Sequence, residues 1–89
     1  MKQKYFRDKA VLITGASSGI GAELARQLGK AGAKLTLTAR RRELLESLGQ
    51  GLAVECDVTR DGDLERAVAE TVRQWGKLDI VIANAGFGV

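Results

Sequence analysis

Three glycines and two serines stand close together near the start of the chain, in the segment TGASSGIG at residues 14–21. They are Gly15, Gly19 and Gly21, with Ser17 and Ser18 between the first two glycines. The segment follows an apolar run, AVLI, and precedes a stretch with helical spacing. A turn between a strand and a helix points unsatisfied backbone N–H groups and the positive end of the helix dipole at one place. A phosphate group is the natural ligand there.

These glycines have the spacing G-x-x-x-G-x-G, and we expect each of them to have a different role. It matches neither G-x-G-x-x-G nor the ATP-binding P-loop, in which Gly-Lys-Ser/Thr follows. We expect Gly15 to allow the tight turn, Gly19 the close approach of a pyrophosphate, and Gly21 close packing of helix on strand. Ser17 and Ser18 can add hydroxyl donors. The alternative is a plain connection in which the glycines serve only geometry, although such a turn requires fewer of them.

Three consecutive arginines, Arg40 to Arg42, form the second candidate group. Folds that bind NAD place a carboxylate about twenty residues after the glycines, where it binds the ribose 2′-OH. Arg40 stands at this place instead. A guanidinium can make two charge-assisted hydrogen bonds to a 2′-phosphate, so the sequence favours NADP (NADPH). The alternative is a solvated run of charge at the start of a helix.

These residues must be positioned by strands and helices that alternate along the chain. Short apolar or threonine-rich runs predict strands at residues 10–14, 34–39, 52–57 and 78–83. Helices are predicted from Ile20 to about residue 30, at 41–48, and from a cap at Thr59 or Asp61 to near Gly76. Alternation of this kind predicts an α/β fold, a Rossmann-type doubly wound parallel sheet with helices on both faces.

Apolar spacing predicts the two longer helices. In the first helix, Ile20, Leu24 and Leu28 recur every four residues. In the last helix the apolar pattern is carried by Leu64, Ala67, Val68, Thr71, Val72 and Trp75. Both patterns are typical of a helix.

Three motifs in chain order resemble those of the short-chain dehydrogenase/reductase family. TGASSGIG, which includes Ile20, resembles the family's TGxxxGIG signature; CDV at 56–58 and NAG at 84–86 follow the predicted third and fourth strands. The resemblance implies the strand order 3-2-1-4. It also implies that residues 1–89 are the NAD(P)-binding Rossmann part, about the first third of such an enzyme, without the catalytic C-terminal part.

The resemblance also implies roles for single residues. Asp57 and Val58 look like the pair that contacts adenine, and Arg40 looks like the main 2′-phosphate contact, with Arg41 as a helper. The family's segment that lines the cofactor's ribose and stabilises the central sheet is matched here by Asn84, Ala85 and Gly86. The usual form of that motif is NNAG, and Ala83 stands in its first place here. Ser18 occupies a position at which some NADP-preferring relatives carry a basic residue. Alternatives are a helix-capping or loop carboxylate at Asp57 and a turn residue at Asn84.

The chemistry that the resemblance implies is hydride transfer between NADP(H) and a carbonyl or alcohol substrate in the full-length parent. The family's catalytic serine, tyrosine and lysine lie after the fourth strand, so this chain alone is expected to be inactive. Tyr5 and Lys9 have the Y-x-x-x-K spacing, but they precede the first strand, about 15 Å from the strands' carboxyl ends, where ligands bind. The rival function is a non-catalytic dinucleotide-binding module.

Composition excludes several other classes of protein. The 89 residues carry a net charge of +3, with no histidine and one cysteine, Cys56. A disulfide framework and a typical zinc site are therefore not expected, and a nucleic-acid partner would need a stronger basic patch. No signal peptide or membrane-length apolar run is present in the sequence. We expect a cytoplasmic protein that forms a homo-oligomer. The chain as given is also expected to self-associate through the fourth strand, whose edge the rest of the family fold would cover.

Overall fold

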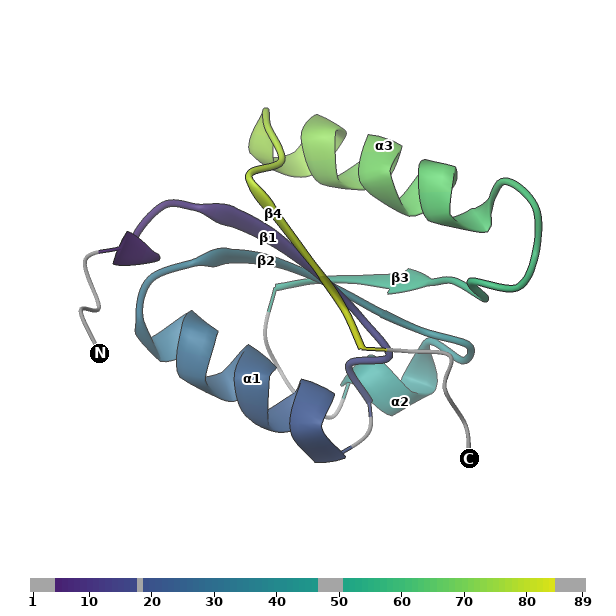
Figure 1. Ribbon diagram of the computed structural model, residues 1–89, viewed down its shortest axis with the longest axis horizontal. Coiled ribbons are helices and arrows are strands. Elements are labelled where there is room, and N and C mark those ends of the chain that lie inside the picture. Colours follow the sequence, from purple (N-terminus) through teal and green to yellow (C-terminus); the bar gives the residue numbers. More distant parts are fainter. Residues whose placement is uncertain (1–4, 18, 47–50, 85–89) are drawn as a thin grey trace.

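The computed structural model describes residues 5–17, 19–46 and 51–84, which form one parallel sheet with helices on both faces. The elements in chain order are β1 (Ala10–Thr14), α1 (Gly19–Lys30), β2 (Lys34–Ala39), α2 (Glu43–Glu46), β3 (Leu52–Glu55), α3 (Asp63–Trp75) and β4 (Ile80–Ala83). The strand order is β3-β2-β1-β4, and every pair is parallel. Figure 1 shows α1 and α2 on one face of the sheet and α3 on the other. The predicted α/β doubly wound fold and strand order are confirmed.

β1 is buried along its whole length because it lies inside the sheet and is covered on both faces. Val11 and Ile13 pack on the α1 side, with the leucines of β2. Leu12 packs on the opposite side, against Val54 and Ala67. A strand covered on both faces needs apolar residues at every position, which accounts for its unbroken apolar sequence.

The inner face of α1 does not include Ile20. This side chain is 73% exposed, whereas Gly21, Ala25 and Leu28 are the buried residues of the helix. These three follow the i, i+4, i+7 spacing of one helical face, and Ile20 lies about 100° round the helix from Gly21. The small residues Gly21 and Ala25 therefore form the contact surface.

α3 begins later than predicted and exposes part of its apolar pattern. Neither Thr59 nor Asp61 caps it; the N-cap residue is Gly62, with φ 87° and no side-chain hydrogen bond. Ala67 and Thr71 are buried, whereas Leu64 and Val72 are 38% and 44% exposed. The helix therefore contacts the sheet through two short side chains, while the bulkier Leu64 and Val72 remain partly exposed. The predicted end is correct, because Gly76 (φ 82°) caps the helix and its N–H donates to Val72 O.

Three other boundaries differ from the sequence prediction. α2 begins at Glu43, so the arginines Arg40 to Arg42 lie in the preceding loop; the predicted end at residue 48 lies outside the described residues. β3 ends at Glu55, two residues early. β4 begins at Ile80, because Asp79 pairs with Ala10 through both backbone and side chain: its N–H donates to Ala10 O, and its Oδ2 accepts from Ala10 N–H.

Candidate functional site

The glycine turn, residues 15–17, connects the end of β1 to α1. Gly15 has φ 64°, in the left-handed region that glycine adopts without steric cost. Ala16 is buried, and its N–H donates to Thr38 O in β2 at 2.9 Å. The turn is therefore held against the neighbouring strand, and the first residues of α1 follow it at the carboxyl end of the sheet (Figure 1).

The next two glycines have opposite surroundings. A Cβ added at Gly21 would lie 2.6 Å from Asn84 Nδ2 and 2.6 Å from Gly15 O, closer than real Cβ atoms come. A Cβ added at Gly19 would meet no atom of the described chain within 4 Å. The helix thus packs closely at Gly21, while the space in front of Gly19 is open, with the exposed side chain of Ile20 beside it.

Asn84 joins the end of β4 to the glycine turn. Its backbone N–H donates to Thr14 Oγ1 at 3.0 Å, and its side-chain Nδ2 donates to Gly15 O at 3.1 Å. The amide thereby fixes the first glycine of the turn from the other side of β1. Three of the predicted site residues, Ser18, Ala85 and Gly86, lie outside the described residues. Ser17 is described and is half-buried in the turn.

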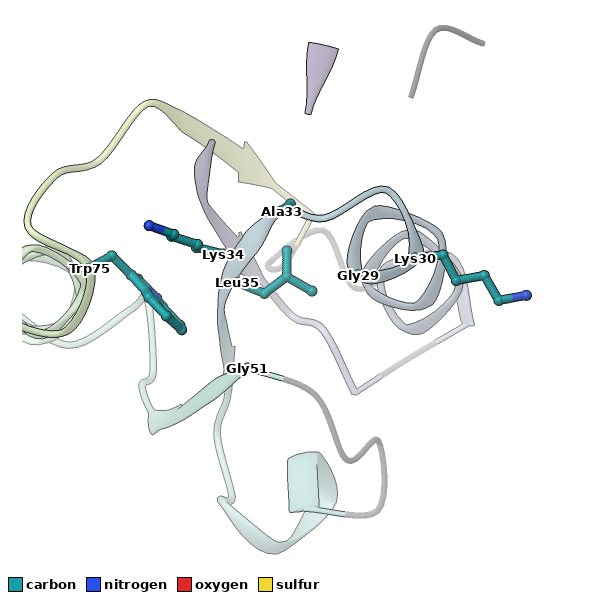
Figure 2. A pocket seen from close by; sticks show the side chains of 7 residues that line it. All are labelled: Gly29, Lys30, Ala33, Lys34, Leu35, Gly51 and Trp75. Atoms are coloured by element: carbon teal, nitrogen blue, oxygen red, sulfur yellow. The ribbon is translucent and has the colours of Figure 1, made fainter. Parts of the chain in front are cut away.

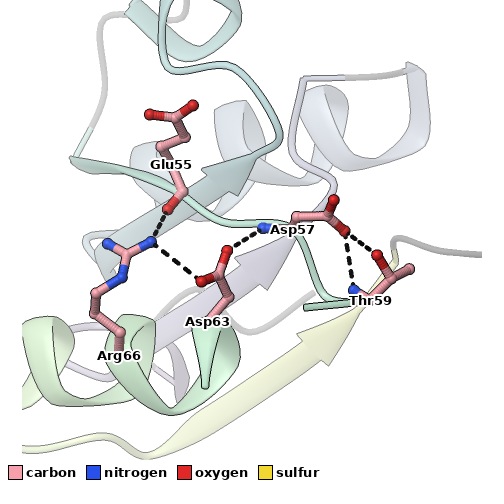
Figure 3. Close-up of polar contacts among 5 residues, drawn as sticks. All are labelled: Glu55, Asp57, Thr59, Asp63 and Arg66. Atoms are coloured by element: carbon pink, nitrogen blue, oxygen red, sulfur yellow. Dashed lines mark hydrogen bonds and ion pairs between the residues drawn. The ribbon is translucent and has the colours of Figure 1, made fainter. Parts of the chain in front are cut away.

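Asp57 lies in the loop between β3 and α3, and its carboxylate closes that loop. Asp57 Oδ1 accepts from the backbone N–H and the hydroxyl of Thr59, at 2.9 and 2.6 Å (Figure 3). These two hydrogen bonds, with a smaller effect of the nearby Arg40 charge, hold the pKa of Asp57 below its usual value of 3.8. The side chain is therefore ionised at neutral pH. The next residue, Val58, is 37% exposed.

Arg40 and Arg41 lie in the exposed loop between β2 and α2. The chain segments that follow β2 and β3 stay side by side, because Cys56 N–H still donates to Ala39 O at 2.8 Å. This pairing places Arg40 near Asp57. Arg41 forms a long exposed ion pair with Glu43, with 3.9 Å between the charged atoms. The structure therefore gathers the glycine turn, the arginine loop, the Asp57 loop and Asn84 at one end of the sheet.

Tyr5 and Lys9 lie at the opposite end of the sheet. Tyr5 is 59% exposed; its ring meets Phe6 edge to face, with the centroids 5.0 Å apart, and Lys9 Nζ lies 5.4 Å from its centroid. The same N-terminal turn is tied to the connection between α1 and β2, because Asp8 N–H donates to Gly32 O. The structure agrees with the expectation that this pair is remote from the glycine turn.

A hollow of about 460 Å³ also lies at this opposite end (Figure 2). Its lining comes from the end of α1, the starts of β2 and β3 and the end of α3: Gly29, Lys30, Ala33, Lys34, Leu35, Gly51 and Trp75. Trp75 Nε1 donates to Thr36 Oγ1 at 3.3 Å, which fixes the indole over β2. Figure 2 shows the Lys30 side chain directed away from Trp75. Local sequence patterns did not predict this hollow, because its residues come from four separate segments.

Sequence reasoning also missed Asp63 and Arg66, which contact the chain on both sides of Cys56. The available signal was an acidic residue in the first helical turn with an arginine three positions later.

In the described ranges, no helix is long and apolar enough to cross a membrane.

The chain is similar to known short chain dehydrogenases over most of its length. The family model of the short chain dehydrogenases matches residues 9–89. A relative from Arabidopsis thaliana, 11-beta-hydroxysteroid dehydrogenase-like 3, is 47% identical over 87 residues, which cover 88% of this chain and 28% of the relative. The chain thus spans less than a third of the length of this relative.

Two solved structures share the fold of the chain. A metagenomic short-chain oxidoreductase in complex with NADP has a TM-score of 0.84 and 32% identity, over 93% of this chain and 41% of that one. The 3-ketoacyl-(acyl-carrier-protein) reductase from Brucella melitensis, complexed with NADH, has a TM-score of 0.80 and 33% identity, over 85% and 34%. One neighbour thus holds NADP and the other NADH.

Proposed function

Because this chain belongs to the short-chain dehydrogenase family, we propose that residues 1–89 are the NADP(H)-binding part of an oxidoreductase. In the whole protein, hydride would pass between NADP(H) and a carbonyl or alcohol substrate. The observation that carries this proposal is the open space at Gly19, at the N-terminus of α1 and next to the tight turn at Gly15.

A pyrophosphate fits this space for reasons of both shape and charge. The first backbone N–H groups of α1 have no carbonyl partner within the helix, and the helix dipole favours an anion there. The missing side chain at Gly19 lets the phosphate oxygens approach the backbone. Ser17 and Ser18 supply hydroxyl donors, and the exposed Ile20 gives the bound cofactor an apolar surface.

The finer preference for NADP(H) over NAD(H) rests on Arg40, with help from Arg41. Both are exposed in the loop after β2, and a guanidinium can bind a 2′-phosphate through two charge-assisted hydrogen bonds. A carboxylate at this place would repel that phosphate.

The remaining predicted contacts lie at the same carboxyl end of the sheet. Asp57 accepts a hydrogen bond from the adenine 6-amino group, and Val58 packs against the ring. Asn84, Ala85 and Gly86 line the ribose. The side chain of Asn84 is already bonded to Gly15 O, so we assign its ribose contact to the backbone.

NADPH supplies the hydride, and the residues of this chain bind and orient the cofactor. The catalytic serine, tyrosine and lysine are expected after residue 89, so we propose that the chain alone does not reduce carbonyls. A non-catalytic dinucleotide-binding module would use the same turn and loops. An assay of NADPH oxidation by the whole protein, with a broad panel of carbonyl compounds, decides between the two functions.

The cofactor assignment is tested by titrating the protein with NADPH and NADH. Replacing Arg40 by Ala removes charge-assisted hydrogen bonds worth about 1.5–3 kcal/mol, which weakens NADPH binding about ten- to a hundredfold. Binding of NADH should hardly change. Arg42→Ala, a change at an exposed arginine in the same loop, is the control. Equal losses for both cofactors in Arg40→Ala would contradict the role given to Arg40.

We propose, in addition, that the protein is cytoplasmic and forms a homo-oligomer. The single, buried, unpaired cysteine suits a reducing compartment. The oligomeric state is measured by sedimentation equilibrium of the whole protein.

A further inference from the structure

Two side chains in the first turn of α3 form hydrogen bonds with the backbone of residues 55 and 57, at the end of β3 and just after it. Asp63 Oδ2 accepts from the backbone N–H of Asp57 at 2.9 Å. Three residues further along the helix, Arg66 Nη2 donates to the backbone carbonyl of Glu55 at 2.5 Å. Figure 3 shows both contacts, which are made by the residues before and after Cys56 in the sequence.

The two fastening side chains also contact each other. Arg66 Nη2 lies 3.8 Å from Asp63 Oδ1, and the Asp63 side chain is only 21% exposed. Cys56, between the two fastened peptide groups, is 3% exposed and packs into the core with Leu12, Val54 and Ala67. Burial, with a smaller contribution from the Asp63 charge, raises the pKa of the Cys56 thiol, so this residue packs as a neutral apolar group. Residues 55–57 are thus held by one buried side chain and two hydrogen bonds from α3.

This fastening decides where the Asp57 carboxylate points. Its backbone is held by Asp63, and its Oδ1 is held by both donors of Thr59. Both of those bonds go to Oδ1; within the described ranges, no donor reaches Oδ2. Figure 3 shows this second oxygen directed away from Thr59 and from α3. The loop therefore presents one acceptor oxygen in a fixed direction at the carboxyl end of the sheet.

We propose that Asp63 and Arg66 are positioning residues of the cofactor site, which hold the Asp57 loop so that Asp57 Oδ2 accepts a hydrogen bond from the adenine 6-amino group. This inference rests on the proposed binding of NADP(H). It adds that recognition of the adenine base depends on a pair of α3 side chains that do not touch the cofactor. Loss of either side chain releases the loop and the oxygen with it.

The test compares two ligands that differ only at the base. NADPH carries an adenine amino donor, and its hypoxanthine analogue carries a carbonyl oxygen at the same place. We expect Asp63→Ala to weaken NADPH binding about three- to tenfold while it changes binding of the analogue less than twofold. The ratio of the two dissociation constants, measured by calorimetry, thus falls toward one. Arg66→Ala should lower the ratio in the same direction, and it serves as the second variant if Asp63→Ala does not fold.

Two further variants separate positioning from a general loss of structure. Asp63→Asn keeps an oxygen that can accept from Asp57 N–H, so it should restore the ratio of the unmodified protein. Glu65→Ala removes the same charge from the same turn of α3 at an exposed side chain, and should leave the ratio unchanged. If Asp63→Ala weakens both ligands equally, or neither, the inference is wrong.

Failure of the inference can be told apart from failure of the proposed function. If the unmodified protein does not bind NADPH, both are wrong. If it binds NADPH and the hypoxanthine analogue equally well, Asp57 makes no adenine contact; the inference is then overturned, while the binding of NADP(H) stands.

Discussion

A hydrogen atom in place of a side chain at Gly21 lets α1 lie against the turn that precedes it. A methyl group there would meet Asn84 Nδ2, Gly15 O and Ala16 Cα at 2.6, 2.6 and 3.0 Å. Two of these three atoms are backbone and cannot move far. We expect Gly21→Ala to lower the free energy of unfolding by about 1–3 kcal/mol, the usual cost of overpacking. Urea unfolding followed by circular dichroism measures it.

Gly19→Ala is the matched control for this substitution. Both residues lie in the first turn of α1, but a Cβ at Gly19 meets nothing within 4 Å. The free energy of unfolding should stay the same or rise by less than about 1 kcal/mol, whereas NADPH binding should weaken because the methyl group occupies phosphate space. A protein as unstable as Gly21→Ala would contradict this account of the turn.

At the scale of single residues, the glycine spacing predicted the backbone geometry of the turn, whereas side-chain contacts were harder to predict. The positive φ at Gly15 and the close approach at Gly21 follow from a turn that joins a strand directly to a helix. The contacts of Asp63 and Arg66 with residues 55–57 could not be predicted. They depend on where the β3 strand stops and on the rotation of α3 about its axis, which local spacing leaves undetermined.

At the scale of elements, α3 approaches the sheet closely because its own residues on the inner face are small. Ala67 is fully buried on that face, whereas Ala69 is exposed. We expect Ala67→Leu to push the helix outward and to cost about 1–3 kcal/mol of unfolding free energy. Ala69→Leu should change it by less than about 0.5 kcal/mol. Midpoints of urea denaturation compare the two; equal midpoints would show that α3 does not rest on Ala67.

Asp79 adds a charged contact to the pairing of β1 with β4. Its Oδ2 accepts from Ala10 N–H at 2.8 Å and lies 3.2 Å from Lys77 Nζ. The bond from Ala10, with a smaller effect of Lys77, holds the pKa of Asp79 below its usual 3.8. A depressed pKa stabilises the folded state above the unfolded-state value, and this contribution disappears as pH falls through the folded-state value.

Asp79→Asn tests this pH dependence, because the amide keeps an acceptor oxygen but does not titrate. We expect the unmodified protein to lose more stability than the variant between about pH 5 and pH 2. Asp57, whose pKa is also lowered, accounts for part of the dependence that remains in the variant. Parallel curves of unfolding free energy against pH would exclude a role for the Asp79 charge.

The strands were easier to predict than the helix faces. A buried parallel strand needs apolar or threonine residues at every position, and β1 and β2 begin and end at the predicted residues. The apolar spacing did not indicate which helical residues contact the sheet. Ile20, Leu64 and Val72 are exposed, because the contact is made by smaller residues that let the helix approach. The ends of β3 and β4 were wrong where side chains replace backbone partners, as Asp79 does at Ala10.

At the scale of the whole molecule, β4 forms one edge of the sheet in the described residues. In the described residues β4 pairs only with β1, and Val81 is 48% exposed on it. An uncharged edge of this kind can pair with a second copy of the chain. We expect the 89-residue chain to self-associate and Val81→Lys to reduce the association. Sedimentation equilibrium measures it, with Ala69→Lys on the exposed side of α3 as the control.

A chain of this length that stays monomeric at high concentration would contradict the prediction for the edge. If both lysine variants reduce association equally, the effect comes from net charge, and β4 is then not the contact.

The hydrogen bonds from Asn84 to the glycine turn join residues 69 and 70 positions apart. Such distant pairs form only after a long loop has closed, and that closure carries an entropy cost which local contacts do not. During synthesis on the ribosome, Gly15 therefore leaves the exit tunnel long before the partner that fixes its carbonyl. A ligand that requires the finished turn would meet it only late in folding. Its binding should then slow unfolding and leave the folding rate almost unchanged.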